Sequence, residues 1–157
     1  LSYMEVFVAY VLASIVRGFL VGAGIYLVIL IFFDMPLQSL SWVFIFALIG
    51  NGFLGVLGVI AAIWAEKFDQ LAAFQNFVIL PLTFLSGVFY TIHSLPPFWE
   101  SISRFNPFFY VIDGFRYGFF GISDVSPYFS LMIVGIGFLA VSWVTLRMLK
   151  IGYKLRQ

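Results

Sequence analysis

Four long apolar runs dominate the sequence, and each one is bounded by charged or helix-breaking residues. A helix needs about 20 apolar residues to cross roughly 30 Å of hydrocarbon, and each run meets that length. We therefore predict four transmembrane helices with approximate spans 12–33, 40–64, 71–92 and 127–147. Pro81 lies inside the third run and is expected to kink it.

The stretch between the third and fourth runs has a different pattern. Residues 98–120 are rich in aromatic side chains but carry charges, and Asn106 and Pro107 cut them into pieces too short to span. We predict a re-entrant pair of short helices dipping into one leaflet. Glu100 and Arg104 are spaced as an i, i+4 ion pair. Apolar side chains share another face of the first piece: Phe98, Ile102 and Phe105.

Composition strengthens the membrane interpretation. Of the 157 residues, 63% are apolar and 10% are charged, and the mean hydropathy is +1.10. A soluble domain of this size has too little interior to bury so many apolar side chains. The sequence thus predicts an all-α integral membrane protein, and it excludes a disordered chain and, with no cysteine, a disulfide scaffold.

The positive charges predict the orientation. Four crossings place both chain ends on one side of the membrane, and six of the eight Lys and Arg residues then fall on that side. Because cytoplasmic loops are enriched in Lys and Arg, the termini are expected in the cytoplasm and the short helices outside. The six are Arg17, Lys67, Arg147, Lys150, Lys154 and Arg156, against Arg104 and Arg116.

Few residues suggest chemistry. Asp113 and Arg116 lie three apart, and an ion pair that fixes a short helix explains them, with a proton relay or substrate contact as the alternative. His93 is the only histidine, so no zinc or bis-histidine haem site is expected, and no catalytic triad. No Gly-rich phosphate loop and no basic stripe are present, so neither bound nucleotide nor nucleic acid is expected.

Small residues suggest close helix packing. Gly18 and Gly22 are four apart, and the second run has a series of glycines. Asn51 lies among them at mid-membrane depth and is expected to hydrogen-bond to a neighbouring helix. The series consists of Gly50, Gly52, Gly55 and Gly58.

A discontinuous pattern in the second half of the chain resembles the signature region of type-2 ABC transporter permeases. Its residues are Ile79, Leu82, Leu85, Ser86, Gly87, Val88, Leu95, Pro96, Pro107, Phe108, Tyr110 and Arg116. The segments AEKFDQLAAFQNFVILPLTFLSGVFY, NPFFYVIDGFRYGF and GYKLRQ also resemble this family. Within the signature and re-entrant region we single out Ser86, Gly87, Pro96, Pro107, Tyr110, Asp113 and Arg116.

The resemblance implies a fold. Such permeases have six transmembrane helices with cytoplasmic ends and an outer re-entrant pair between helices five and six. The four runs then correspond to helices three to six, and residues 1–157 to an N-terminally truncated transmembrane domain. Helices one and two and the N-terminal amphipathic helix are expected to be missing.

The resemblance also implies a function, namely a permease subunit in a bacterial inner membrane that exports a drug, a lipid-linked molecule or a polysaccharide. It implies a second permease chain in a homodimer, surrounding membrane lipid, and a cytoplasmic ATPase subunit that holds ATP and Mg²⁺. This chain would itself be no enzyme. Coupling to the ATPase would involve the cytoplasmic segments with Glu5, Glu66, Lys67 and Asp69.

The third run offers a hypothesis for the transport path. Phe77, Phe84 and a kink at Pro81 would form a face that repacks against the second permease chain. Two other functions stay open at this point. One is a passive pore or a partner-binding scaffold without ATP. The other is an intramembrane enzyme that uses Asp113 and His93, which lie on opposite sides of the break at Asn106 and Pro107.

Overall fold

The computed structural model describes residues 2–152, and every regular element in that range is a helix. Lys154 and Arg156, two of the six basic residues expected on the cytoplasmic side, lie outside the described residues. The elements are α1 (Tyr3–Phe32), α2 (Leu40–Trp64), α3 (Phe68–Phe74), a π-helical turn (Gln75–Ile79), α4 (Leu80–Phe84), a 3-10 turn (Ile92–Ser94), α5 (Pro97–Arg104), α6 (Pro107–Phe120) and α7 (Pro127–Ile151).

Within residues 2–152, three helices are long and apolar enough to cross a membrane, namely α1, α2 and α7. The prediction of an all-α membrane protein is therefore confirmed. Helix α1 begins earlier than the predicted residue 12, because Ser2 and Glu5 form a capping box. The Ser2 hydroxyl accepts a hydrogen bond from the Met4 N–H at 3.3 Å, and the Ser2 N–H donates to the Glu5 carboxylate at 2.9 Å. Arg17 is exposed on α1 rather than turned into the bundle.

The third predicted span requires correction. Helical backbone runs through α3, the π-helical turn and α4 and ends at Phe84, not at residue 92. The chain turns at Gly87, whose φ of 78° lies in the left-handed region that favours glycine. Counting apolar residues missed this turn because the residues after it are apolar as well. The helix geometry is irregular next to Pro81, as expected for a residue without an N–H, and no residue of these three elements is buried.

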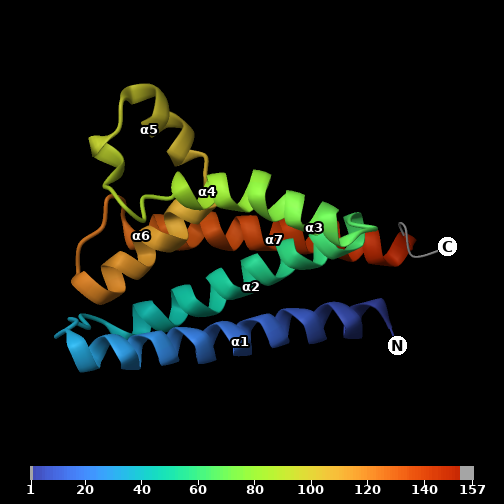
Figure 1. The fold of residues 1–157 in the computed structure, drawn as a ribbon, viewed down its shortest axis with the longest axis horizontal. Helices are drawn as coiled ribbons and strands as arrows, with labels where there is room; N and C mark the ends of the chain where they lie inside the picture. The colour runs from blue at the N-terminus through green and yellow to red at the C-terminus, as the bar shows by residue number, and fades with distance from the viewer. Residues whose placement is uncertain (1, 153–157) are drawn as a thin grey trace.

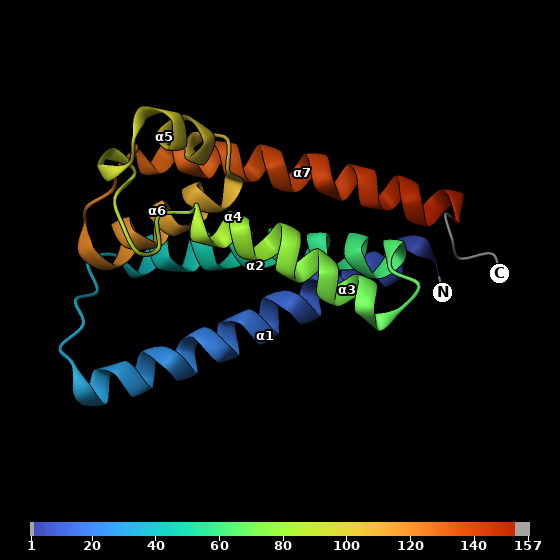
Figure 2. The same cartoon turned by 45° about the horizontal axis from the view of Figure 1, so that its top comes forward.

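The helices form a bundle around α2, which packs against α1, α6 and α7 (Figure 1). Both ends of the described chain and the turn between α2 and α3 lie at one end of the bundle, called here the terminal end (Figure 1). Helices α5 and α6 and their loops lie at the opposite end, called here the cap end. Seen from a second direction, α1 diverges from α2 toward the cap end (Figure 2).

The two short helices within 98–120 are present, but they differ in environment. Helix α5 is largely exposed, whereas α6 lies between α2 and α7 and buries Phe109 and Gly114. Asn106 joins them and is only 3% exposed. Its side-chain oxygen accepts from the Phe108 N–H at 3.0 Å and caps α6, and its side-chain nitrogen donates to the Leu82 carbonyl at 2.5 Å.

Only some of the predicted glycines lie at close helix contacts. A Cβ at Gly18 would overlap the Asn51 side chain, whereas none of the atoms compared lies within 4 Å of a Cβ at Gly22 or Gly58. Asn51 does take part in an interhelical hydrogen bond, but through its backbone: its carbonyl accepts from the Ser14 hydroxyl at 3.1 Å.

We predict that Gly114→Ala destabilises the fold. The added Cβ would overlap the ring of Phe46, which is fully buried, and such overpacking costs about 1–3 kcal/mol. The melting temperature of the purified protein in detergent should fall by several degrees. The matched control is Gly58→Ala on the exposed side of α2, which should leave the melting temperature unchanged or slightly raised. Equal effects of the two substitutions would contradict the packing of α6 against α2.

Candidate functional site

A buried ionic cluster at the cap end contains the two charged residues that the sequence singled out. Arg116 is its only cation, and its guanidinium Nη1 lies 3.0 Å from the Asp124 carboxylate and 3.7 Å from the Asp113 carboxylate. The predicted pair of Asp113 and Arg116 is thus present, but the shorter contact is with Asp124. Asp124 was not among the predicted site residues.

Arg116 also ties the loop after α4 to α6. Its Nη2 donates to the Gly87 carbonyl at 2.6 Å and to the Tyr90 carbonyl at 3.5 Å. Asp124 reaches the same loop from the other direction, because its carboxylate accepts from the Ile92 N–H at 3.0 Å. One arginine and one aspartate therefore satisfy backbone groups of the loop after α4 and of the first residue of the 3-10 turn that follows it.

Asp113 is fully buried and organises the start of the next connection. Its two carboxylate oxygens accept from the Asp124 N–H at 2.7 Å and from the Val125 N–H at 3.2 Å. Burial raises the pKa of the Asp113 carboxyl, and these two hydrogen bonds and Arg116 oppose that rise. The arrangement leaves Asp113 engaged in holding the backbone, which fits the structural interpretation of the pair better than a proton relay.

The other signature residues shape the cap and hold its helices. The Ser86 hydroxyl is buried and donates to the Thr83 carbonyl, and the Tyr110 hydroxyl donates to the Arg104 carbonyl at 2.7 Å. Pro107 begins α6, and the exposed Pro96 immediately precedes α5. Together with Gly87, these residues fix where the short helices begin and end.

His93 lies apart from Asp113 in its interactions. Its ring nitrogen is 3.7 Å from the Glu100 carboxylate, which pairs with Arg104 at 2.8 Å on the exposed surface of α5. The predicted i, i+4 pair is therefore present. No cluster of three metal-binding side chains occurs within residues 2–152. The geometry offers no support for an intramembrane enzyme built on His93 and Asp113.

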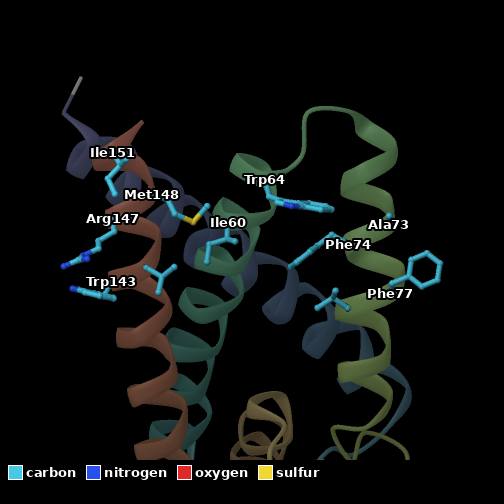
Figure 3. A pocket seen from close by; sticks show the side chains of 11 residues that line it. Ile60, Trp64, Ala73, Phe74, Phe77, Trp143, Arg147, Met148 and Ile151 are labelled. Atoms are coloured by element: carbon cyan, nitrogen blue, oxygen red, sulfur yellow. The ribbon is translucent and has the colours of Figure 1, made fainter. Parts of the chain in front are cut away.

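The predicted transport-path residues lie on the exposed stretch from α3 through the π-helical turn to α4, called here the third helical segment. Phe77 is 81% exposed and Phe84 is 56% exposed, and Phe84 stacks on Phe89 with ring centroids 6.1 Å apart. Phe77 lines an apolar groove of about 710 Å³ near the terminal end, whereas Pro81 and Phe84 lie outside it (Figure 3). Of the three predicted path residues, only Phe77 lines the groove, and their common role in a transport path stays a prediction.

The predicted coupling residues lie together at the terminal end. Glu5 caps the first turn of α1, Glu66 and Lys67 lie in the connection between α2 and α3, and Asp69 lies in the first turn of α3. This connection is held by the Gln70 side chain, which accepts from the Glu66 N–H at 2.6 Å. Lys67 precedes the first residue of α3 and is exposed.

Comparison with known proteins identifies the family. The family model described as ABC-2 type transporter matches residues 1–120. The chain belongs to the ABC-2 type transporter family. The inner membrane transport permease YadH of Escherichia coli K12 is 38% identical over 139 residues, which cover 85% of this chain and 54% of YadH.

More distant relatives also match. The capsule polysaccharide export inner-membrane protein BexB of Haemophilus influenzae is 33% identical over 119 residues, which cover 74% of this chain and 40% of BexB. Nodulation protein J of Rhizobium leguminosarum bv. trifolii is 33% identical over 72 residues, or 46% of this chain and 27% of that protein. No solved structure matches.

Of these relatives, YadH is named a transport permease and BexB a capsule polysaccharide export protein. The chain spans about half the length of YadH and less of BexB. The cap-end cluster lies within the region that the family model matches, except for Asp124, which follows residue 120. Sequence reasoning had one usable signal for Asp124, namely an acidic residue shortly before the Ser126–Pro127 start of a helix.

We expect Arg116→Met to destabilise the cap strongly. The substitution leaves the buried carboxylate of Asp113 and the partly buried carboxylate of Asp124 without a cation, and breaking a buried pair typically costs about 3–5 kcal/mol. The free energy of unfolding should fall accordingly, and the loop at Gly87 should become sensitive to limited proteolysis. Arg104→Gln breaks the exposed pair with Glu100 instead and should cost less than about 1 kcal/mol. Similar losses from both variants would show that the buried cluster does not hold the cap.

Proposed function

We propose that this chain is the permease part of an ATP-driven ABC exporter in a bacterial inner membrane, with its terminal end in the cytoplasm. The observation that carries the proposal is the division of the bundle into two unlike ends, in a chain of the ABC-2 family. One end has short charged connections suited to a partner subunit. At the other end, α5, α6 and their loops form a cap that the ionic cluster of Asp113, Arg116 and Asp124 holds against the helices.

ATP and Mg²⁺ are assigned to a separate cytoplasmic ATPase subunit, as the family resemblance implies. Contact with that subunit would involve Glu5 and the connection from Glu66 to Asp69, because both lie at the terminal end and both are exposed. Movement of this connection would act directly on α3, whose first turn contains Asp69. The third helical segment is therefore the element through which ATPase closure would reach the membrane.

A second permease chain is proposed to pack on the exposed apolar surfaces of this one. Helix α1 buries only Phe7 and Val11, and the segment from α3 to α4 buries no residue. The outward phenylalanines of that segment, Phe77 and Phe84, would then repack between open and closed states. We propose a homodimer, because a single apolar face of this length suits a second copy of itself.

The cargo is proposed to belong to the drug, lipid-linked or polysaccharide classes. BexB is named for capsule polysaccharide export, which supports an outward direction and a sugar-containing cargo. Aromatic side chains such as Phe77 and Phe84 suit both the apolar faces of sugars and lipid anchors. The cap would act as the lid over the exit, since it lies across the end opposite the charged connections.

The transport path is tested by export measurements on Pro81→Ala and Phe84→Ala in the full-length protein with its ATPase. Both should reduce ATP-coupled export severalfold while membrane insertion and ATPase copurification persist. The control is Leu139→Ala, because Leu139 is 68% exposed on α7 and lies outside both the proposed path and the proposed ATPase contact. Unchanged export in both variants would remove the third segment from the path. Failure of any ATPase to copurify would favour a passive pore or a scaffold.

Orientation is tested by cysteine labelling, which the absence of cysteine from this chain makes direct. Glu100→Cys and Lys150→Cys lie at the cap end and the terminal end of the bundle. A membrane-impermeant maleimide added to intact spheroplasts should label Glu100→Cys only, and lysis should expose Lys150→Cys. Labelling of both positions in intact spheroplasts would overturn the proposed topology.

A further inference from the structure

An apolar groove of about 710 Å³ opens at the terminal end, away from the ionic cluster of the cap (Figure 3). Helix α2 supplies Ile60 and Trp64, the third helical segment supplies Phe74, and α7 supplies Val144 and Arg147. This volume lies within the roughly 300–1,000 Å³ range of ligand-binding pockets. The groove is named here the α2–α7 groove after the two long helices that bound it.

The groove exists because α3 stands off from the bundle. No residue of α3 is buried, and the small side chain of Ala73 forms part of the wall, so this wall does not close against α7. Phe74 and Phe77 come from the side of the third segment, and Met148 and Ile60 line the space between the walls (Figure 3). Its lining is apolar along almost its whole length.

Arg147 lies at the edge of the groove on α7, and Figure 3 shows its side chain pointing to the side of α7 that faces away from the third helical segment. Its guanidinium carbon lies 4.3 Å from the ring centroid of Trp143, which also lines the groove, so the two form a cation–π pair. No carboxylate within residues 2–152 forms an ion pair with Arg147 or with Lys150, one turn further along α7. Tryptophan and arginine at the end of a transmembrane helix lie at headgroup depth.

We propose that the α2–α7 groove binds an anionic phospholipid. An acyl chain lies along Ile60, Phe74 and Val144, and the phosphate lies at Arg147 on the edge of the groove. Charge complementarity supports this occupant: the groove is apolar and ends at α7 beside a cation that has no acidic partner among the described residues, and an anionic lipid supplies both an apolar chain and a negative charge. The proposal needs membrane embedding alone, so loss of ATP coupling or of export would not bear on it.

The test is quenching of tryptophan fluorescence by brominated lipids in the full-length protein in nanodiscs. Trp143 is kept as the only tryptophan, and phenylalanine replaces the others. Phosphatidylglycerol with brominated acyl chains should quench Trp143 at an about fivefold lower mole fraction than brominated phosphatidylcholine, the ratio expected for one cation near an anionic lipid.

Two variants separate the charge from the apolar groove. Arg147→Gln should bring the ratio of the two lipids to about one, whereas Lys67→Gln, an exposed cation at the same end but outside the groove, should leave the fivefold ratio intact. Ala73→Phe fills the groove and should weaken quenching by both lipids. Its far-ultraviolet circular dichroism and elution volume report whether the fold is kept.

Three results would overturn the proposal. The first is equal quenching by both lipids in the unaltered protein, which means contact with bulk lipid only. The second is an unchanged ratio in Arg147→Gln. The third is protection of Trp143 from both lipids together with cross-linking of Trp143→Cys between two copies, which means that a second chain fills the groove.

Discussion

A bilayer offers no water to an exposed backbone amide, so a chain that leaves helical geometry inside a membrane protein must satisfy its N–H and C=O groups from its own side chains. At the cap end, Arg116, Asp113 and Asp124 do this for the loops on either side of α6, and Asn106 does it for the break before α6. The geometry of the cap therefore depends on four polar side chains. Because each of them bonds to backbone, the cap position is fixed to α4, α6 and the start of α7 together.

The same requirement explains why the two ends of the bundle differ. The terminal end needs no buried charges, because its short connection at Glu66 is exposed and one side chain from Gln70 suffices to hold it. The cap end carries two short helices and their loops, of which α6 packs between α2 and α7. In this ABC-2 family chain, side-chain hydrogen bonds to backbone shape one end of the bundle, whereas the other end has a short exposed connection.

Sequence patterns predicted the parts of this structure that depend on local composition. The apolar run of α2 starts and ends where the predicted span 40–64 does, and Pro107 with Asn106 predicted the start of α6. The predicted end of the third span at residue 92 was wrong, because the chain turns at Gly87 without any change of hydropathy. Asp124 was missed because its partners, Arg116 and the Ile92 N–H, come together only after two loops close. Hydropathy says nothing about such pairings over distance.

The third helical segment is held by side-chain hydrogen bonds at both of its ends and has irregular helix between them. At the cap end it is held by two hydrogen bonds, from the Asn106 side chain to the Leu82 carbonyl and from Arg116 to the Gly87 carbonyl just after the segment. At the terminal end its first turn follows the connection that the Gln70 side chain holds. Between these points no residue is buried, and the π-helical turn and Pro81 replace regular helix. A helix that is held at both ends and buries no residue between them changes shape most readily at its irregular turn, because few contacts must break there. Phe77 and Val78 of that turn line the α2–α7 groove, so an occupant of the groove would contact the part of the third helical segment that has the least regular geometry.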